Sequence, residues 1–301
     1  MKRNPKPVPS VFEEMQRFMV EVDPGIKLNL IRHGRNPVSF FMVHGLASNA
    51  RLYDGVALEL EKKGYSSIAL DQRGHGDSSK PAGIYTHDLF CSDLARIAEA
   101  SSELGAISRP VWVGQSWGAS VVSEFASRFP QHVGALVLVD GGLIDLKWIF
   151  ENWESCSAFL TPPNLSGVTM AQVEAWIRNE HPAWSDTAVA STLANLELND
   201  EGGISAKLSR THHMEILHEL YNYDPLATLA KVAVPIRFLI AGKQNSLFAN
   251  YRERAIDTIG KVCNVTFEIF DDGDHDLHAQ NPHRVAEIAQ ELLLTSTRGD
   301  L

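Results

Sequence analysis

The chain has 301 residues, and its hydrophobic content of 44% can bury a large core, either in one domain with an insertion or in two small domains. The formal charge of −10 disfavours nucleic acid and anionic membranes as partners, because a negative protein repels polyanions. The first ten residues, MKRNPKPVPS, carry positive charge but no apolar stretch follows them, and no long apolar run occurs elsewhere. We therefore expect neither a signal peptide nor a membrane span.

The cysteines Cys91, Cys156 and Cys263 are odd in number, widely spaced and without a C-x-x-C pair. This pattern favours free thiols that fill a core in a reducing compartment. We expect a cytoplasmic protein with a small-molecule substrate, no nucleic-acid or membrane partner, no metal and no cofactor.

Short apolar segments alternate with segments of helical periodicity along most of the chain. FMVEV and IKLNLI flank the turn signal DPG and predict an antiparallel hairpin. Six further strands are expected at VSFFMV, SSIAL, PVWVG, ALVLV, IRFLIA and VTFEIF. Helices are expected near 51–63, 88–104, 117–129, 248–260 and 283–294. This alternation predicts the α/β class, with a mostly parallel eight-stranded sheet and helices on both faces.

The regular alternation stops after the sixth predicted strand. About 90 residues then follow without a clear strand, which is too long for a structureless loop in a compact domain. We expect a helical cap at residues 143–225, inserted after the sixth strand over the carboxyl edge of the sheet, where open parallel sheets bind ligands. The core would then comprise residues 1–142 and 226–301. The segment contains tryptophans that either line a site or form the cap's own core: Trp148, Trp153, Trp176 and Trp184.

The stretch Gly114-Gln115-Ser116-Trp117-Gly118 has the pattern G-x-S-x-G. The pattern alone is weakly specific, but here it joins a predicted strand to a predicted helix, which is the setting of a nucleophile elbow. The flanking glycines allow a sharp turn that presents the Ser116 hydroxyl at the edge of the sheet. The alternative is a serine that only caps the helix.

The third predicted strand ends in His44-Gly45-Leu46-Ala47. The glycine allows the chain to bend over the elbow, so that the backbone N–H groups of Leu46 and Trp117 could converge on one substrate oxygen. Two such donors would form an oxyanion hole.

Together these motifs resemble the α/β-hydrolase superfamily, in its serine-nucleophile branch with a helical cap. The similarity covers nearly the whole chain and follows the family's order: HGLASN, DQRGHGDSS, GQSWG, LVLVDGG, LIAG and DDGDHDLHAQNP. It implies an α/β-hydrolase fold and a structural rather than catalytic role for Asp71, Arg73 and His75. It also implies that the base lies after the eighth strand, at His275 rather than at the neighbouring His278.

The acid that orients the histidine is the uncertain member of the triad. The family most often places it shortly after the seventh strand, where this chain has Gly242-Lys243-Gln244-Asn245. Asn245 can accept a hydrogen bond from the ring but carries no charge. Asp140, at the end of the sixth strand beside the strand of Ser116, is the alternative, and some relatives take the acid from this place. Asp272, Asp274 and Asp276 are expected to cap the following helix or to be solvated.

These residues predict a serine esterase-like hydrolase that cleaves an ester, lactone or amide through an acyl-enzyme. The resemblance leaves a carbon–carbon bond hydrolase and a proline iminopeptidase-like enzyme open. The iminopeptidase would need cap carboxylates for a free amine, from among Glu151, Glu154, Glu174 and Glu180. A ligand-binding or weakly active relative is a further alternative. Serine at the elbow speaks against the epoxide hydrolase and haloalkane dehalogenase branches, whose nucleophile is a carboxylate.

Overall fold

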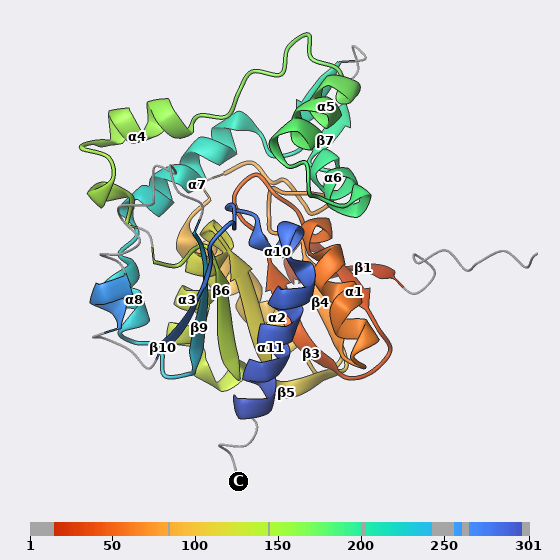
Figure 1. Cartoon of the computed structure of the whole chain (residues 1–301), viewed down its shortest axis with the longest axis vertical. Coiled ribbons are helices and arrows are strands. Elements are labelled where there is room, and N and C mark those ends of the chain that lie inside the picture. Colours follow the sequence, from red (N-terminus) through yellow and green to blue (C-terminus); the bar gives the residue numbers. More distant parts are fainter. Residues whose placement is uncertain are drawn as a thin grey trace, which may run out of the picture.

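One eight-stranded sheet runs through the middle of the protein (Figure 1). The computed structural model describes residues 15–83, 85–143, 145–199, 203–242, 256–260 and 265–296. The strands follow the spatial order β1-β2-β4-β3-β5-β6-β9-β10. Their bounds are β1 Gln16–Asp23, β2 Ile26–His33, β3 Val38–Val43, β4 Ser66–Leu70, β5 Ala106–Gln115, β6 Ala135–Val139, β9 Ile236–Ala241 and β10 Val265–Phe270.

The sheet is antiparallel at one side and parallel elsewhere. β2 pairs antiparallel with both β1 and β4, and the strands from β4 to β10 pair in parallel. Every residue of β3, β4 and β6 is buried, whereas the edge strands β1 and β10 keep exposed positions. Continuous apolar runs suit the central strands because helices cover both of their faces. The predicted mostly parallel sheet is therefore confirmed.

Two layers of helices enclose the sheet. α2 (His87–Glu99) and α3 (Trp117–Arg128) pack on one face, and α1 (Asp54–Lys62) and α11 (Pro282–Ser296) on the other. Successive side chains of β6 enter the two layers in turn, because side chains of a strand alternate between its faces. Within the described ranges, no helix is both long and apolar enough to cross a membrane.

Between β6 and β9 the chain forms a separate group of elements above the carboxyl edge of the sheet, with its last helix, α8, beside the sheet (Figure 1). The elements are η3 Leu146–Trp148, α4 Trp153–Leu160, α5 Met170–Glu180, α6 Asp186–Leu193, β7 Leu196–Leu198, β8 Ile204–Ala206, α7 Arg210–Asn222 and α8 Pro225–Leu229. The antiparallel pair β7 and β8 was not expected. Each of these strands has only three residues, too few to show an alternating pattern.

Two predicted features lie partly outside the described residues. Most of the helix expected at 248–260 falls there, as does Cys263. Cys91 and Cys156 are free and buried, and burial raises the pKa of their thiols to about 12 and about 11. Both thiols are therefore protonated near neutral pH.

Candidate active site

Ser116 occupies a sharp turn between β5 and α3. Its backbone has φ of 53° and ψ of −122°, and its side chain makes no capping hydrogen bond although it stands at the N-cap of α3. A Cβ atom on Gly118 would collide with the backbone of Val43 and His44, and one on Gly114 would lie 2.6 Å from the Gly118 carbonyl oxygen. Both glycines are thus required by the close packing of the turn against β3 and β5, as expected of a nucleophile elbow.

Backbone strain is concentrated at the same edge of the sheet. Among the described residues, Ala47, Ser116 and Asp140 are the non-glycine residues with positive φ, at 58°, 53° and 40°. They follow β3, β5 and β6, which are neighbours in the sheet. Such conformations cost about 1–3 kcal/mol each and persist where the surrounding structure holds them, often at functional sites.

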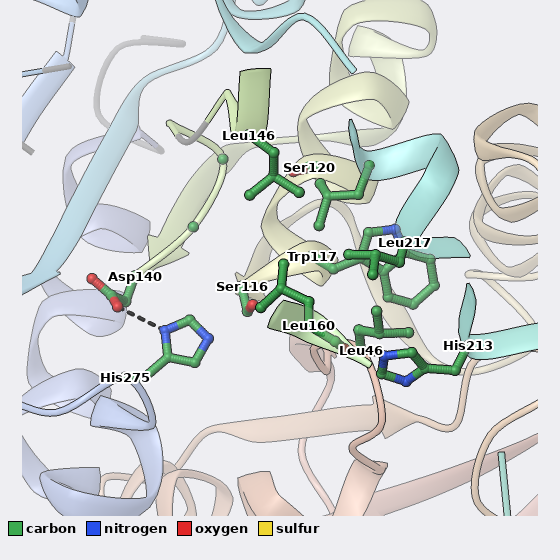
Figure 2. Close-up of a pocket in the computed structure, with 13 residues that line it drawn as sticks. Leu46, Ser116, Trp117, Ser120, Asp140, Leu146, Leu160, His213, Leu217 and His275 are labelled. Carbon is green, nitrogen blue, oxygen red and sulfur yellow. Dashed lines mark hydrogen bonds and ion pairs between the residues drawn. The ribbon is translucent and has the colours of Figure 1, made fainter. Parts of the chain in front are cut away.

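Asp140 and His275 are in direct contact. The Oδ2 atom of Asp140 lies 2.7 Å from Nδ1 of His275, and its Oδ1 atom accepts a hydrogen bond of 3.0 Å from the backbone N–H of Ala241. The Asp140 side chain is 5% exposed and that of His275 is 49% exposed. A carboxylate accepts the Nδ1 proton and leaves the lone pair on Nε2. Figure 2 shows this second nitrogen on the side of Ser116.

The two alternatives for the orienting acid have different outcomes. Asn245 lies outside the described residues. Asp140 reaches His275 from the end of β6, and its bond to Ala241 ties the same carboxylate to the end of β9. The contact with the ring is therefore made from the sixth strand, next to the strand that carries Ser116.

His278 is not placed like His275. It is fully buried, its ring packs 4.6 Å from that of Tyr53, and burial lowers its pKa to about 3. His278 is therefore neutral at physiological pH, and His275 is the histidine of this segment that faces the cavity described below.

A neutral histidine holds the loop after β3. Nδ1 of His44 lies 2.7 Å from the Gly45 carbonyl oxygen, and the Gln72 N–H donates to Nε2 at 3.0 Å. Burial lowers the pKa of His44 to about 4, which agrees with an Nε2 atom that accepts rather than donates. A Cβ atom on Gly45 would meet Gln115 and Ser116, so glycine lets Leu46 approach the elbow.

Asp71 and Arg73 of the DQRGHGDSS segment make internal contacts that fit the structural role implied by the resemblance. The Asp71 carboxylate accepts hydrogen bonds from Asn29 Nδ2 and from the backbone N–H groups of Ala50 and Asp77. Arg73 forms a buried two-point ion pair with Asp93, at 2.9 and 2.6 Å. These bonds fix the loop beside the site.

The expectation that the aspartates around His275 cap a helix or are solvated is wrong for Asp276. This residue is the N-cap of α10 (Leu277–Gln280) but makes no capping side-chain bond. Gln115 Nε2 donates to Asp276 Oδ1 and to the His275 carbonyl oxygen, both at 3.2 Å, and burial raises the pKa of Asp276. Gln115, the variable residue before Ser116 in the elbow motif, thus holds the loop that carries His275. The motif pattern does not predict this contact.

A cavity of about 260 Å³ lies beside Ser116. Ser116, His275 and Asp140 line it together with five leucines and Trp117 (Figure 2): Leu46, Leu146, Leu160, Leu217 and Leu220. The predicted site residues therefore meet at one cavity with a mainly apolar wall.

His213 and Ser120 also line the cavity, and sequence reasoning missed both. His213 was visible only within THHMEILH, which lacks metal-ligand spacing. The four tryptophans of the insertion are not among the described lining residues, and Trp184 instead joins a separate apolar cluster with Ile177. Within the described ranges, no group of three or more histidine, cysteine or acidic side chains is placed to hold a metal ion.

Comparison with known proteins places the chain in a family. A family model described as alpha/beta hydrolase fold matches residues 38–282. Bifunctional epoxide hydrolase 2 of Mus musculus is 29% identical over 134 residues, which are 44% of this chain and 23% of that protein. A 2-(acetamidomethylene)succinate hydrolase of Mesorhizobium japonicum is 33% identical over 120 residues, 40% of this chain and 41% of that protein. The chain thus matches less than half the length of each.

The similarity to solved structures extends over almost the whole chain. A crystal structure of E-2-(acetamidomethylene)succinate hydrolase has a TM-score of 0.74 at 20% identity and covers 93% of this chain and 99% of its own. At this identity the likeness shows a shared fold. From the family match and this architecture, the chain belongs to the α/β-hydrolase fold family.

Proposed function

We propose that the protein is a serine hydrolase for a small or medium-sized, partly apolar ester, lactone or amide. Ser116 is the nucleophile, His275 the general base and Asp140 the acid that orients the imidazole. The observation that carries the proposal is the 2.7 Å contact between His275 and Asp140 beside a strained serine in a leucine-lined cavity. Two of the relatives are named as hydrolases, a bifunctional epoxide hydrolase and a 2-(acetamidomethylene)succinate hydrolase.

The reaction begins when Nε2 of His275 takes the proton from the Ser116 hydroxyl. The serine oxygen attacks the substrate carbonyl, and His275 then gives the proton to the leaving group. This leaves an acyl-enzyme. Water, deprotonated by the same imidazole, attacks the acyl-enzyme; the imidazolium then returns the proton to the departing Ser116 oxygen, which releases the carboxylic acid and restores the enzyme. Asp140 stabilises the imidazolium that forms in each half of the reaction.

The backbone N–H groups of Leu46 and Trp117 are proposed to bind the oxyanion. Both residues line the cavity. Trp117 is the first residue of α3, so its N–H has no acceptor within the helix. The strained Ala47 backbone turns the chain directly after Leu46. An oxyanion donor typically contributes about 10²–10³-fold to turnover.

The site gives less support to two of the other activities considered, the peptidase and the epoxide hydrolase. A peptidase that holds a free amine needs a carboxylate beside the substrate, and Asp140, already bound to His275, is the one acidic side chain among the described lining residues. Epoxide opening by the family's carboxylate nucleophile is not proposed, because the elbow carries Ser116.

Labelling by a fluorophosphonate probe together with a substrate panel tests the proposal. We expect Ser116 to be labelled and para-nitrophenyl esters to be hydrolysed, in preference to aminoacyl anilides and vinylogous diketones. Ser116→Ala should lower kcat by about 10⁵-fold or more. Ser127→Ala, a serine further along α3 that bonds to the Glu124 carbonyl oxygen, is the matched control and should keep full activity. An unlabelled Ser116 in folded protein would overturn the proposal.

A further inference from the structure

A second, larger hollow adjoins the cavity of Ser116. It measures about 460 Å³ and is called the outer cavity here. Its walls come from residues 162–166 after α4, from β8 and from the start of α7. His213 lines both cavities, and Ala47 of the outer cavity follows Leu46 of the inner one. Ligand sites usually enclose about 300–1,000 Å³, so the inner cavity alone is small, whereas the two together fall in this range.

The linings of the two cavities differ in chemistry. Five leucines dominate the inner cavity. The outer cavity has seven apolar lining residues, but it adds six amide, hydroxyl or guanidinium side chains and has no described acidic residue: Asn164, Ser166, Asn199, Ser205, Ser209 and Arg210. A molecule that spans both would be apolar near Ser116 and could carry a polar group at its far end.

The polar end of this space is positive, although the protein as a whole carries a formal charge of −10. Arg210 makes no ion pair within the part of the chain that the structure describes. It is the first residue of α7, a helix of 13 residues whose N-terminus adds a partial positive charge. The outer cavity therefore favours an anionic group.

His213 stands in the wall between the cavities. It is 9% exposed, and its Nε2 lies 3.3 Å from the Leu160 carbonyl oxygen. Because a carbonyl only accepts, Nε2 carries the proton, and Nδ1 has no partner among the described residues. Burial lowers the pKa of His213, so the ring is neutral. A polar ring that is nine-tenths buried, with a free nitrogen between two cavities, is suited to contact a ligand that passes from one to the other.

The position of His275 determines which part of a substrate points toward the outer cavity. His275 must protonate the leaving group, so the leaving group lies on its side of Ser116. Figure 2 shows His275 and His213 on opposite sides of Ser116. The acyl part of the substrate therefore extends across the leucines toward His213 and the outer cavity.

We infer that the outer cavity receives the far end of the acyl group, and that the preferred substrates are esters whose apolar acyl chain ends in a carboxylate or another anionic group. Arg210 and the N-terminus of α7 bind this anion, and the leucines bind the chain. The inference rests on the proposed function, because it assigns the two sides of Ser116 by the roles of an acyl-enzyme mechanism.

Esters with one leaving group and two kinds of chain end test the inference. The neutral set is para-nitrophenyl hexanoate, octanoate and decanoate, and the acidic set is the mono-para-nitrophenyl esters of adipic, suberic and sebacic acids. The readout is the ratio of kcat/KM for acidic over neutral ester at equal chain length. We expect Arg210→Gln to lower this ratio about fivefold for the longest pair, near the upper limit for an exposed ion pair. Arg210→Lys should keep part of the wild-type kcat/KM ratio, and added salt should lower this ratio in the wild-type protein.

Arg96→Gln is the matched control, because Arg96 is an exposed arginine on α2 that pairs only with Glu99 among the described residues. It should leave the ratio unchanged. The effect of Arg210→Gln should grow from adipate to sebacate, because only the longer chains reach the outer cavity. An effect of equal size at all chain lengths would indicate that the charge of Arg210 acts through its long-range electrostatic field rather than at a binding site, and would overturn the inference.

A second variant tests the connection between the cavities. His213→Trp should narrow it and lower kcat/KM for decanoate about tenfold while hexanoate is affected less, since one lost methylene contact is worth about tenfold or more. One outcome is that the esters are hydrolysed while Arg210→Gln leaves the acidic-to-neutral ratio of kcat/KM unchanged and His213→Trp leaves the decanoate-to-hexanoate ratio unchanged. In that case the inference fails and the proposed function stands. If the wild-type protein hydrolyses none of the six esters, the inference fails, and the proposed function fails with it when Ser116 is also not labelled by the fluorophosphonate probe.

Discussion

The strand ends that carry the candidate triad and the inserted elements above them differ in burial and in hydrogen bonding. Asp140 is buried and bonded on both carboxylate oxygens, and Ser116 sits in a turn with no room for a side chain at either flanking glycine. In the insertion, Phe159 and Trp176 are 62% and 52% exposed. Groups that do chemistry need positions fixed to within fractions of an ångström, whereas a wall that selects substrates need only have the right shape and polarity. Changes at the strand ends should therefore lower kcat, and changes in the insertion should act mainly on selectivity.

After removal of the nucleophile itself, the largest effect is expected from Asp140→Asn, which keeps the shape but removes the charge beside His275. Turnover should fall about 10⁴-fold, the loss that an aspartate-to-asparagine change causes in a chymotrypsin-type triad. Steady-state kinetics with para-nitrophenyl esters measures it. Asp145→Asn is the matched control, since this carboxylate caps η3 and contacts the Lys147 N–H. Asn245→Ala should change turnover little, and the reverse result would assign the orienting role to the amide.

The free energy of unfolding should also decrease in acid. The unfolded chain protonates its histidines near pH 6.5, but buried His44 and His278 have pKa values lowered to about 4 and about 3. Below about pH 6.5 the unfolded state therefore binds protons that the folded state does not. The free energy of unfolding then falls by up to about 1.4 kcal/mol per pH unit for each histidine. The raised pKa of Asp276 offsets part of this loss.

His278→Phe tests this origin of acid sensitivity. Neither ring nitrogen of His278 has a hydrogen-bond partner among the described residues, so an apolar ring should be tolerated at pH 7.5. Urea unfolding between pH 7.5 and 5 should show a shallower decline than in the wild type. His283→Phe, at an exposed position on α11, should leave the slope unchanged. An equally steep decline in His278→Phe would show that other groups cause the acid sensitivity.

The smallest effect is expected where the insertion contacts the loop that carries His275. His181 Nδ1 lies 2.9 Å from Oδ2 of Asp274, the residue directly before His275, and its ring stacks on Trp184 at 3.9 Å. His181→Ala removes one partly buried hydrogen bond and should lower kcat/KM about two- to fivefold. Arg178→Ala, whose partners Glu174 and Asp186 both lie in the insertion, should have no effect. A loss of 100-fold or more in His181→Ala would mean that the insertion positions the base, and would weaken the contrast between the strand ends and the insertion.

The central strands and the elbow could be predicted because their signals are local. Each central strand is a short apolar run, and G-x-S-x-G lies between a strand and a helix. The same reasoning failed for β7 and β8, because a three-residue strand is too short to show a periodic pattern in the sequence. It also failed for Asp276, because a hydrogen bond to Gln115, which is distant in the sequence, produces no local pattern. His213 escaped notice because α7 is brought over Ser116 only by the packing of the insertion.

By itself, the sequence determined the fold class and named Ser116 and His275, because backbone turns and strand ends are encoded by neighbouring residues. It left Asp140 and Asn245 as alternatives for the partner of the histidine. The tertiary structure brought Asp140 to the ring of His275 across 135 residues of chain, and it gathered the leucines, His213 and Arg210 around two adjoining cavities. Such contacts depend on how distant elements pack against one another, and no local pattern carries that information.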